Sequence, residues 1–166
     1  MRATSSGNTG MSSSFSDYNQ FLMMGKISAS GNVNTLLDQN GNATLTEWCY
    51  FNMFQNCTSL TSAPELPATT LANFCYANMF NRCTSLTSAP ELPATTLAEN
   101  CYASMFQDCY NLNTIKLSYT GDFSANYFSN WVSGVASTGT FYYNGSDTTT
   151  GTSAIPEGWT VTQFTS

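Results

Sequence analysis

The chain has 166 residues, 42% of them hydrophobic and 8% charged, and a formal net charge of -6. This length suits one domain, and the apolar content supports a packed core and excludes wholesale disorder. The basic residues stand singly in the sequence: Arg2, Lys26, Arg82 and Lys116. Nucleic acids and anionic membrane surfaces need clustered basic residues, so the chain is predicted to bind neither. No apolar run is long enough to span a membrane, so membrane insertion is not expected either.

Residues 1–44 are predicted to form an N-terminal cap that includes a degenerate repeat. Residues 4–20 are rich in serine, glycine and asparagine, which is typical of turns. A strand is predicted over residues 21–29, and a polar turn over residues 38–42. Terminal units of a stacked protein depart from the consensus because they cover the open end of its core.

Residues 45–117 contain three copies of almost the same sequence, at a spacing of 26 residues. The positions that keep this spacing include two cysteines and a Met-Phe pair in each copy: Cys49, Cys75 and Cys101; Cys57, Cys83 and Cys109; Met53-Phe54, Met79-Phe80 and Met105-Phe106. A fixed period between about 20 and 50 residues is typical of a solenoid, in which each repeat is one supersecondary unit.

Each repeat is predicted to contain a short helix followed by an extended segment. The apolar positions of the middle copy follow steps of 4, 4, 1 and 3: Leu71, Cys75, Met79, Phe80 and Cys83. These steps fit one face of a helix or helical turn over residues 72–82. Because Pro90 and Pro93 cannot lie inside a helix, residues 86–92 are predicted to be extended. Stacked copies would bring the extended segments together in a parallel sheet.

Residues 118–166 no longer repeat and are predicted to form a C-terminal cap. Three strands are expected in the last third of the chain: residues 112–117, 140–143 and 159–164. A helix is predicted over residues 125–135, since its apolar residues fall on one face. Trp131 and Trp159 are expected to anchor the cap.

The repeat CYANMFNRCTSLTSAPELPATTLA and the ending NWVSGVASTGTFYYN…IPEGWTV resemble the BspA-like leucine-rich repeats of bacterial cell-surface proteins. The resemblance covers about residues 26–164. It implies a right-handed solenoid with a parallel sheet, exported to the cell surface or beyond, with roles in adhesion and host interaction. One departure concerns Glu65 and Glu91, which occupy the positions equivalent to Leu117. The strands of those copies are therefore expected to end or bulge at the preceding proline.

The cysteines leave two interpretations open. Zinc sites usually combine closely spaced cysteines with histidine, and the chain has no histidine, so no metal or other cofactor is expected. A buried thiol behaves as a small hydrophobe, which favours free thiols in the core. The alternative is one disulfide in each repeat: Cys49–Cys57, Cys75–Cys83 and Cys101–Cys109.

The chain is predicted not to be an enzyme, because catalytic triads and Cys-His pairs both need histidine. Glu65 and Glu91 are acidic residues repeated in register, and they are interpreted as two copies of one solvated position. The Met-Phe pairs are interpreted as core. The tyrosines beside the first cysteine of each copy are expected to pack their rings and keep the hydroxyl in water: Tyr50, Tyr76 and Tyr102.

The candidate binding face consists of polar residues on the extended segments: Thr61, Ser62, Glu65, Thr87, Ser88, Glu91, Asn113 and Lys116. The leading hypothesis is a monomeric, non-enzymatic adhesion module that presents this face to a host or matrix protein or glycan. It would act outside the cell or on its surface, with the signal or anchor outside this chain. The alternative is a structural spacer that displays other domains of a larger exported protein and has no ligand of its own.

Overall fold

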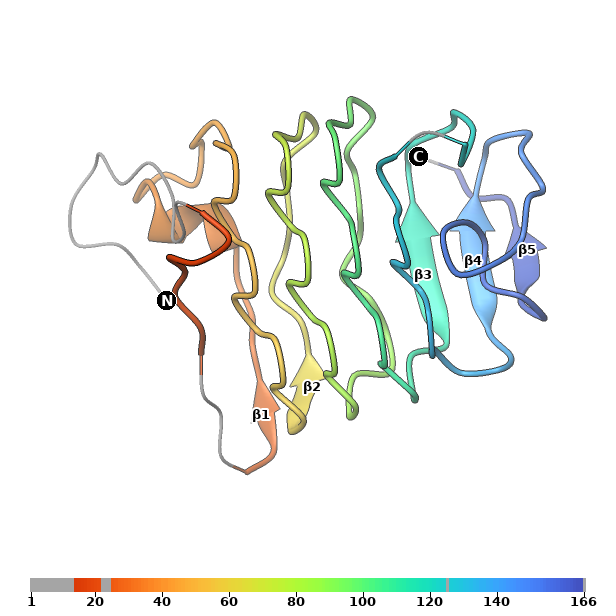
Figure 1. The fold of residues 1–166 in the computed structure, drawn as a ribbon, viewed down its shortest axis with the longest axis horizontal. Helices are drawn as coiled ribbons and strands as arrows, with labels where there is room; N and C mark the ends of the chain where they lie inside the picture. Colours follow the sequence, from red (N-terminus) through yellow and green to blue (C-terminus); the bar gives the residue numbers. More distant parts are fainter. Residues whose placement is uncertain (1–13, 22–24, 125, 166) are drawn as a thin grey trace.

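The computed structural model of the protein describes residues 14–21, 25–124 and 126–165, and parallel strands dominate it, with almost no helix (Figure 1). The strands are short: β1 (Ile27–Ser28), β2 (Leu60–Ser62), β3 (Thr114–Leu117), β4 (Thr140–Tyr143) and β5 (Thr160–Thr162). β1 pairs with β2, and β3, β4 and β5 form a second sheet in that order, with every pairing parallel. Successive segments of the chain lie side by side along the long axis of the molecule (Figure 1).

The predicted strands of the C-terminal part are confirmed, two of them in shortened form. β4 coincides with the prediction for residues 140–143, whereas β3 and β5 cover only part of residues 112–117 and 159–164. β3 and β4 alternate buried and half-buried residues, as strands with one covered face do. The predicted N-terminal strand is reduced to β1, and residues 22–24 of that prediction lie outside the described residues.

The parallel sheet of the predicted fold class is confirmed, but its short helices are wrong. In the described part of the chain the only helical element is a 3-10 turn, η1 (Val33–Leu36). Residues 72–82 instead form consecutive tight turns, and the described residues 126–135 form turns as well. The α-helix prediction fails because only alternate N–H groups bond within the segment.

Two sets of N–H groups alternate along residues 75–80. One set donates to a carbonyl three residues earlier, at 3.1 to 3.3 Å: Cys75 to Ala72, Ala77 to Phe74, and Met79 to Tyr76. The other set donates to the next segment of the chain, at 2.8 to 3.1 Å: Tyr76 to Cys101, Asn78 to Ala103, and Phe80 to Met105. Half of these backbone N–H groups are therefore satisfied by carbonyl groups of the same turns, and the other half by carbonyl groups of the neighbouring segment.

Every fourth residue of these turns has a positive φ. In the middle copy the angles are 54° at Phe74, 54° at Asn78 and 60° at Arg82. Each is the third residue of a hydrogen-bonded turn, the position that a type II turn fills with a residue at positive φ. Asparagine tolerates this conformation, whereas a bulky side chain is strained in it. The regular positive φ is what turns the chain out of a helical path.

Replacing Asn78 tests this backbone conformation. Asn78→Gly is expected to change the free energy of unfolding by less than about 0.5 kcal/mol, because glycine adopts a positive φ freely. Asn78→Val is expected to lower it by about 1–3 kcal/mol, because a β-branched residue is strained there. Urea denaturation measures both, with Thr87→Val as the control at an exposed position. A valine variant as stable as the parent would contradict the turn geometry.

Buried aromatic rings stack between neighbouring segments and form the centre of the core. Phe80 lies 5.5 Å from Phe54 and 5.8 Å from Phe106, measured between ring centroids, and the planes are nearly parallel. The methionines beside these rings, at 53, 79 and 105, are fully buried as well. The interpretation of the Met-Phe pairs as core is therefore confirmed.

The two tryptophans predicted to anchor the C-terminal part are buried there. Trp131 is fully buried, and its Nε1–H donates to the carbonyl oxygen of Ala154 at 2.8 Å. Trp159 is nearly buried and donates to the carbonyl oxygen of Ala136 at 2.7 Å. Each indole thus buries a large apolar surface and satisfies its one donor.

Candidate binding groove between two proline-bearing segments

The strand pairing is interrupted between β2 and the neighbouring segment, residues 86–92. On the side of β2 that faces β1, the N–H of Glu65 donates to the carbonyl of Gly31, and the carbonyl of Glu65 accepts from the N–H of Val33. On the other side of the interruption, Ala89 and Leu92 donate to Thr114 and Lys116, at 2.9 and 3.1 Å. Among the described residues, no backbone hydrogen bond joins residues 60–66 to residues 86–92. The two segments therefore face each other as unpaired edges.

Two prolines explain this interruption. Pro64 and Pro90 lie on the two facing segments, and neither has an N–H group that could donate across the gap. Pairing persists where only one of two neighbours carries proline. The third copy has Lys116 in place of Pro90, and there isolated bridges join Ser88 to Thr114 and Leu92 to Leu117. The gap thus needs prolines on both sides.

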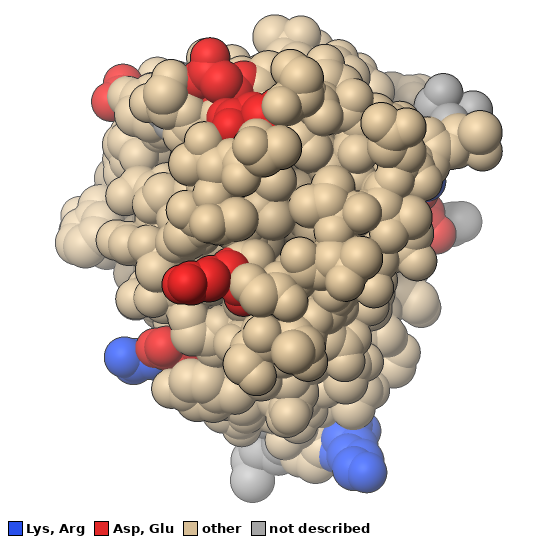
Figure 2. Space-filling view, turned by 90° about the vertical axis from the view of Figure 1, so that its right-hand side faces the viewer, with Lys and Arg blue, Asp and Glu red and all other residues tan. Residues whose placement is uncertain are grey.

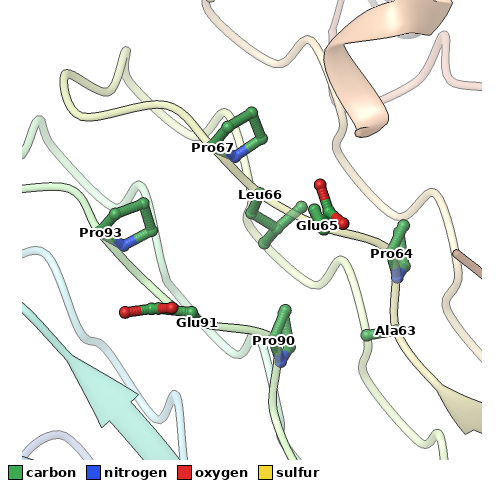
Figure 3. Close-up of a pocket in the computed structure, with 8 residues that line it drawn as sticks. All are labelled: Ala63, Pro64, Glu65, Leu66, Pro67, Pro90, Glu91 and Pro93. Atoms are coloured by element: carbon green, nitrogen blue, oxygen red, sulfur yellow. The ribbon is translucent and has the colours of Figure 1, made fainter. Parts of the chain in front are cut away.

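A groove of about 310 Å³ lies over this gap (Figure 3). Its lining comes from equivalent positions of the two copies: Ala63, Pro64, Glu65, Leu66, Pro67, Pro90, Glu91 and Pro93. All of these except the two glutamates are apolar. In Figure 3 the two Pro-Glu-Leu-Pro stretches run next to each other with their proline rings in corresponding places. The groove is therefore apolar with carboxylates at its border.

The two carboxylates of the groove differ in their partners. Oε1 of Glu91 accepts from Nζ of Lys116 at 2.6 Å, and this Nζ also lies 4.6 Å from the ring centroid of Phe164. Glu65 is exposed and forms no ion pair within the described part of the chain. One carboxylate of the pair is thus matched by a cation of this chain, and the other is open.

The structure brings together only part of the predicted binding face. Glu65 and Glu91 line the groove, and Lys116 contacts Glu91. The remaining predicted residues lie outside the lining: Thr61, Ser62, Thr87, Ser88 and Asn113. Thr61 and Ser62 bind carbonyl oxygens of the β1 region at 3.1 and 3.2 Å, so they support the strand pairing.

Sequence analysis did not assign the four prolines to the site. Pro90 and Pro93 were interpreted as residues that exclude a helix, and Pro64 and Pro90 as points where a strand ends or bulges, although the four prolines make up half of the groove lining. A signal was present, because the stretch Pro-Glu-Leu-Pro recurs in two adjacent copies and is missing from the third. Two prolines in register on neighbouring strands remove donors from both edges of one gap.

All six cysteines are buried thiols, and no disulfide joins them. Three of them donate to a carbonyl of the preceding segment, at 3.0 to 3.1 Å: Cys57 to Phe21, Cys83 to Phe54, and Cys109 to Phe80. Burial raises the pKa of Cys49, Cys101 and Cys109 from 9.0 to about 12. Because the thiolate is the reactive form, these thiols are inert near neutral pH.

The expectation that the tyrosine hydroxyls lie in water is wrong. The rings form a stacked row, with Tyr76 at 5.8 Å from Tyr50 and 6.2 Å from Tyr102, and all three are buried. The hydroxyl of Tyr50 donates to the core-side oxygens of Val33 and Asn34. The row belongs to the core because the turn segments pack their first cysteine and its neighbour inward.

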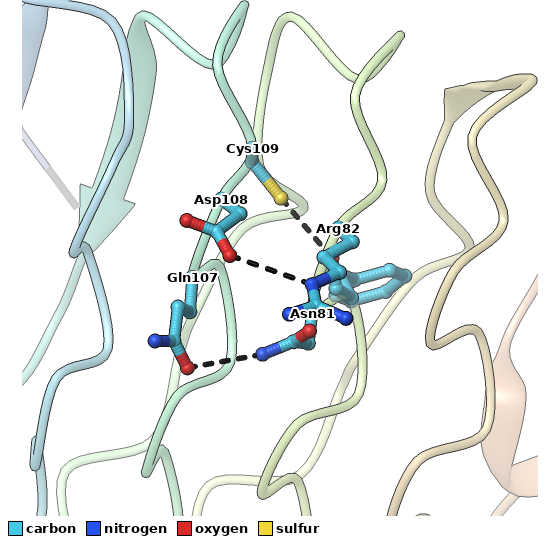
Figure 4. A network of polar contacts seen from close by, with 6 residues as sticks. Asn81, Arg82, Gln107, Asp108 and Cys109 are labelled. Atoms are coloured by element: carbon cyan, nitrogen blue, oxygen red, sulfur yellow. Dashed lines mark hydrogen bonds and ion pairs between the residues drawn. The ribbon is translucent and has the colours of Figure 1, made fainter.

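Polar contacts also link neighbouring segments on the turn side (Figure 4). Nδ2 of Asn81 donates to Oε1 of Gln107 at 3.2 Å, and Nε of Arg82 lies 3.5 Å from Oδ2 of Asp108. The ion pair is solvent-exposed on the arginine side, so its contribution to stability is small. Figure 2 shows a mostly uncharged surface at the β5 end, where charged side chains stand in small separate groups.

The described residues contain no group of three or more potential metal-binding side chains, and no helix among them is long and apolar enough to cross a membrane. Comparison of the chain with protein-family models, with curated proteins and with solved structures found no match. The groove is therefore interpreted from its own chemistry.

Proposed function

We propose that the chain is a non-catalytic binding module of an exported protein and that it holds its ligand on the face formed by its extended segments. The groove between residues 60–66 and residues 86–92 is the observation that carries the proposal. It interrupts an otherwise paired face, and it combines an apolar surface with an open carboxylate. Such a combination is typical of binding sites in proteins.

The proposal includes a right-handed leucine-rich-repeat solenoid of the BspA-like kind. The 26-residue period of the sequence supports it. So do the ring contacts and hydrogen bonds that join residues about 26 positions apart, such as Phe54 with Phe80 and Phe80 with Phe106. A solenoid of this kind exposes its strands as an extended surface suited to binding.

The chemistry of the site supports binding rather than catalysis. The chain has no histidine, and the pKa of its buried thiols is raised, so neither a general base of the usual kind nor a thiolate is at hand. Glu91 is occupied by Lys116 at 2.6 Å.

The variant Pro64→Val/Pro90→Val tests the role of the groove. It restores an N–H donor on each of the two facing segments, so the segments are expected to pair and the groove to close. Hydrogen exchange should then find slow amides at positions 64 and 90. Binding to an array of matrix proteins and glycans is expected to fall at least about tenfold, because contacts to the groove are lost.

The control for this experiment is Thr87→Val, which changes the same face outside the groove. It is expected to bind as the parent does. If the groove closes and binding is unchanged, the ligand binds outside the groove. If the parent chain binds nothing on the array, the alternative function of a structural spacer is favoured. The elongated row of segments in Figure 1 is compatible with a spacer.

A further inference from the structure

The geometry points to one occupant for the groove: a lysine or arginine side chain carried by an extended segment of a partner protein. This inference rests on the proposed function and specifies its ligand. It follows from the size of the groove, from the arrangement of apolar and charged groups in it, and from an ion pair that the chain itself forms one strand away.

The size of the groove fits a side chain better than a larger ligand. Its volume of about 310 Å³ lies at the lower end of the range for ligand pockets, about 300–1,000 Å³. A site of this size buries one or two side chains. An extended segment can supply them while the rest of it runs over the adjoining face.

The lining matches both parts of a long basic side chain. Lysine and arginine combine an apolar stem with a charged head, and they bury the stem along apolar surface while the head stays at the rim. Pro67, Pro90 and Pro93 offer the accessible apolar surface, and Glu65 offers an exposed carboxylate at the border. A neutral apolar side chain would leave this carboxylate unmatched.

An ion pair within the chain shows how the face receives an ammonium group. Lys116 reaches from β3 to Glu91 on the neighbouring segment, at 2.6 Å. One repeat earlier the glutamate is Glu65, and the position equivalent to Lys116 is Pro90. The described residues supply no cation to Glu65. A partner that brings a lysine or arginine would complete the second pair.

The charge of the whole chain favours such a partner. With a net charge of -6 and four basic residues in all, the molecule attracts positively charged segments over a distance. The facing edges of residues 60–66 and residues 86–92 form no backbone hydrogen bonds with each other, so their carbonyl groups can accept from an extended segment.

A peptide titration tests the inference. The probe is the acetylated heptapeptide Ala-Val-Ala-Lys-Ala-Val-Ala, added to the isotope-labelled full chain and followed by amide chemical shifts. Saturable shifts are expected at the amides of Ala63, Glu65, Leu66, Glu91 and Leu92, the non-proline residues of the two stretches. Glu65→Gln is expected to weaken binding by about fivefold, and so is a rise in salt, as for an exposed ion pair. Glu99→Gln is the matched control, because this exposed carboxylate lies outside the groove, and it should leave binding unchanged.

A second peptide separates the charge from the stem. With norleucine in place of lysine the stem is kept and the ammonium is lost, and binding is expected to weaken by about as much as in Glu65→Gln. Equal binding of the two peptides would overturn the inference, as would displacement of the lysine peptide by a neutral glycan. If the array finds ligands and the peptide gives no shifts, the inference fails and the proposed function stands. If both are silent, both fail.

Discussion

Phe80→Ala is expected to lower the free energy of unfolding by about 3–5 kcal/mol. The side chain is fully buried, and its ring lies between those of Phe54 and Phe106 at centroid distances of 5.5 and 5.8 Å. Its removal leaves a cavity in the middle of the row and ends two ring contacts at once. Urea denaturation followed by circular dichroism measures the loss.

The control for this variant is Phe15→Ala. The Phe15 side chain is 71% exposed and its ring lies 5.6 Å from that of Phe51, so the change in stability should stay below about 1 kcal/mol. A Phe80 variant that loses less than about 1.5 kcal/mol would show that the rows of rings do not form the core.

Alkaline pH is expected to unfold the protein well before its tyrosines would titrate in the core. Burial raises the pKa of Cys49, Cys101 and Cys109 from 9.0 to about 12, and it raises the pKa of Cys75 and Cys83 further. The stabilisation from neutral thiols is therefore complete below pH 9 and is lost as the pH rises through the folded-state values. Above pH 9 the unfolded chain binds fewer protons than the folded one, so stability falls with pH.

The size of this effect follows from the number of thiols. Each one lowers the free energy of unfolding by about 1.4 kcal/mol per pH unit between the two pKa values. Five thiols together remove on the order of 7 kcal/mol per unit, which is comparable with the whole stability of a domain. Denaturation curves at pH 7, 8, 9 and 10 should show a plateau followed by a steep fall.

Cys101→Ala provides the comparison. The variant should have a slope above pH 9 that is shallower by about 1.4 kcal/mol per pH unit, because one titrating group is gone. A stability that stays constant from pH 8 to pH 10 in the parent protein would mean that the thiols are not buried as the structure has them.

Two regularities of the sequence were predictive: the alternation of buried residues along a strand and the spacing of 26 residues between copies. Residues 140–143 alternate around buried Phe141 and Tyr143, and β4 has the predicted bounds. The identical residues of the three copies also predicted neighbours correctly, since Phe54, Phe80 and Phe106 lie in one row. An equivalent residue in each copy can stack on the next only if the segments lie side by side.

The helices were mispredicted because a step of four residues was taken for a helical period. An α-helix has about 3.6 residues per turn, so each step of four moves the side chain by about 40° around the axis. Leu71, Cys75, Met79 and Cys83 keep the step of four, which a helix would carry off one face. The positive φ angles recur every four residues within each copy, and asparagine occupies four of these positions, at 52, 56, 78 and 100.

The groove could be predicted only in part. Glu65 and Glu91 were placed on the candidate face because they recur in register, and both line the groove. The gap itself depends on which side of each strand lacks a donor. Pro64 and Pro90 lack a donor in any register, but their place on two facing edges follows from how the segments stack, which residue type alone does not give.

The alternating hydrogen bonds of the turns have a mechanical consequence. The N–H groups of Tyr76, Asn78 and Phe80 all bond to the next segment, and the segments follow one another along the long axis of the molecule (Figure 1). These bonds therefore lie along the axis, in series from one end to the other. Tension applied at the two ends would load every interface between segments equally, so the weakest interface would separate first, whereas pressure on the flank would be shared among the segments.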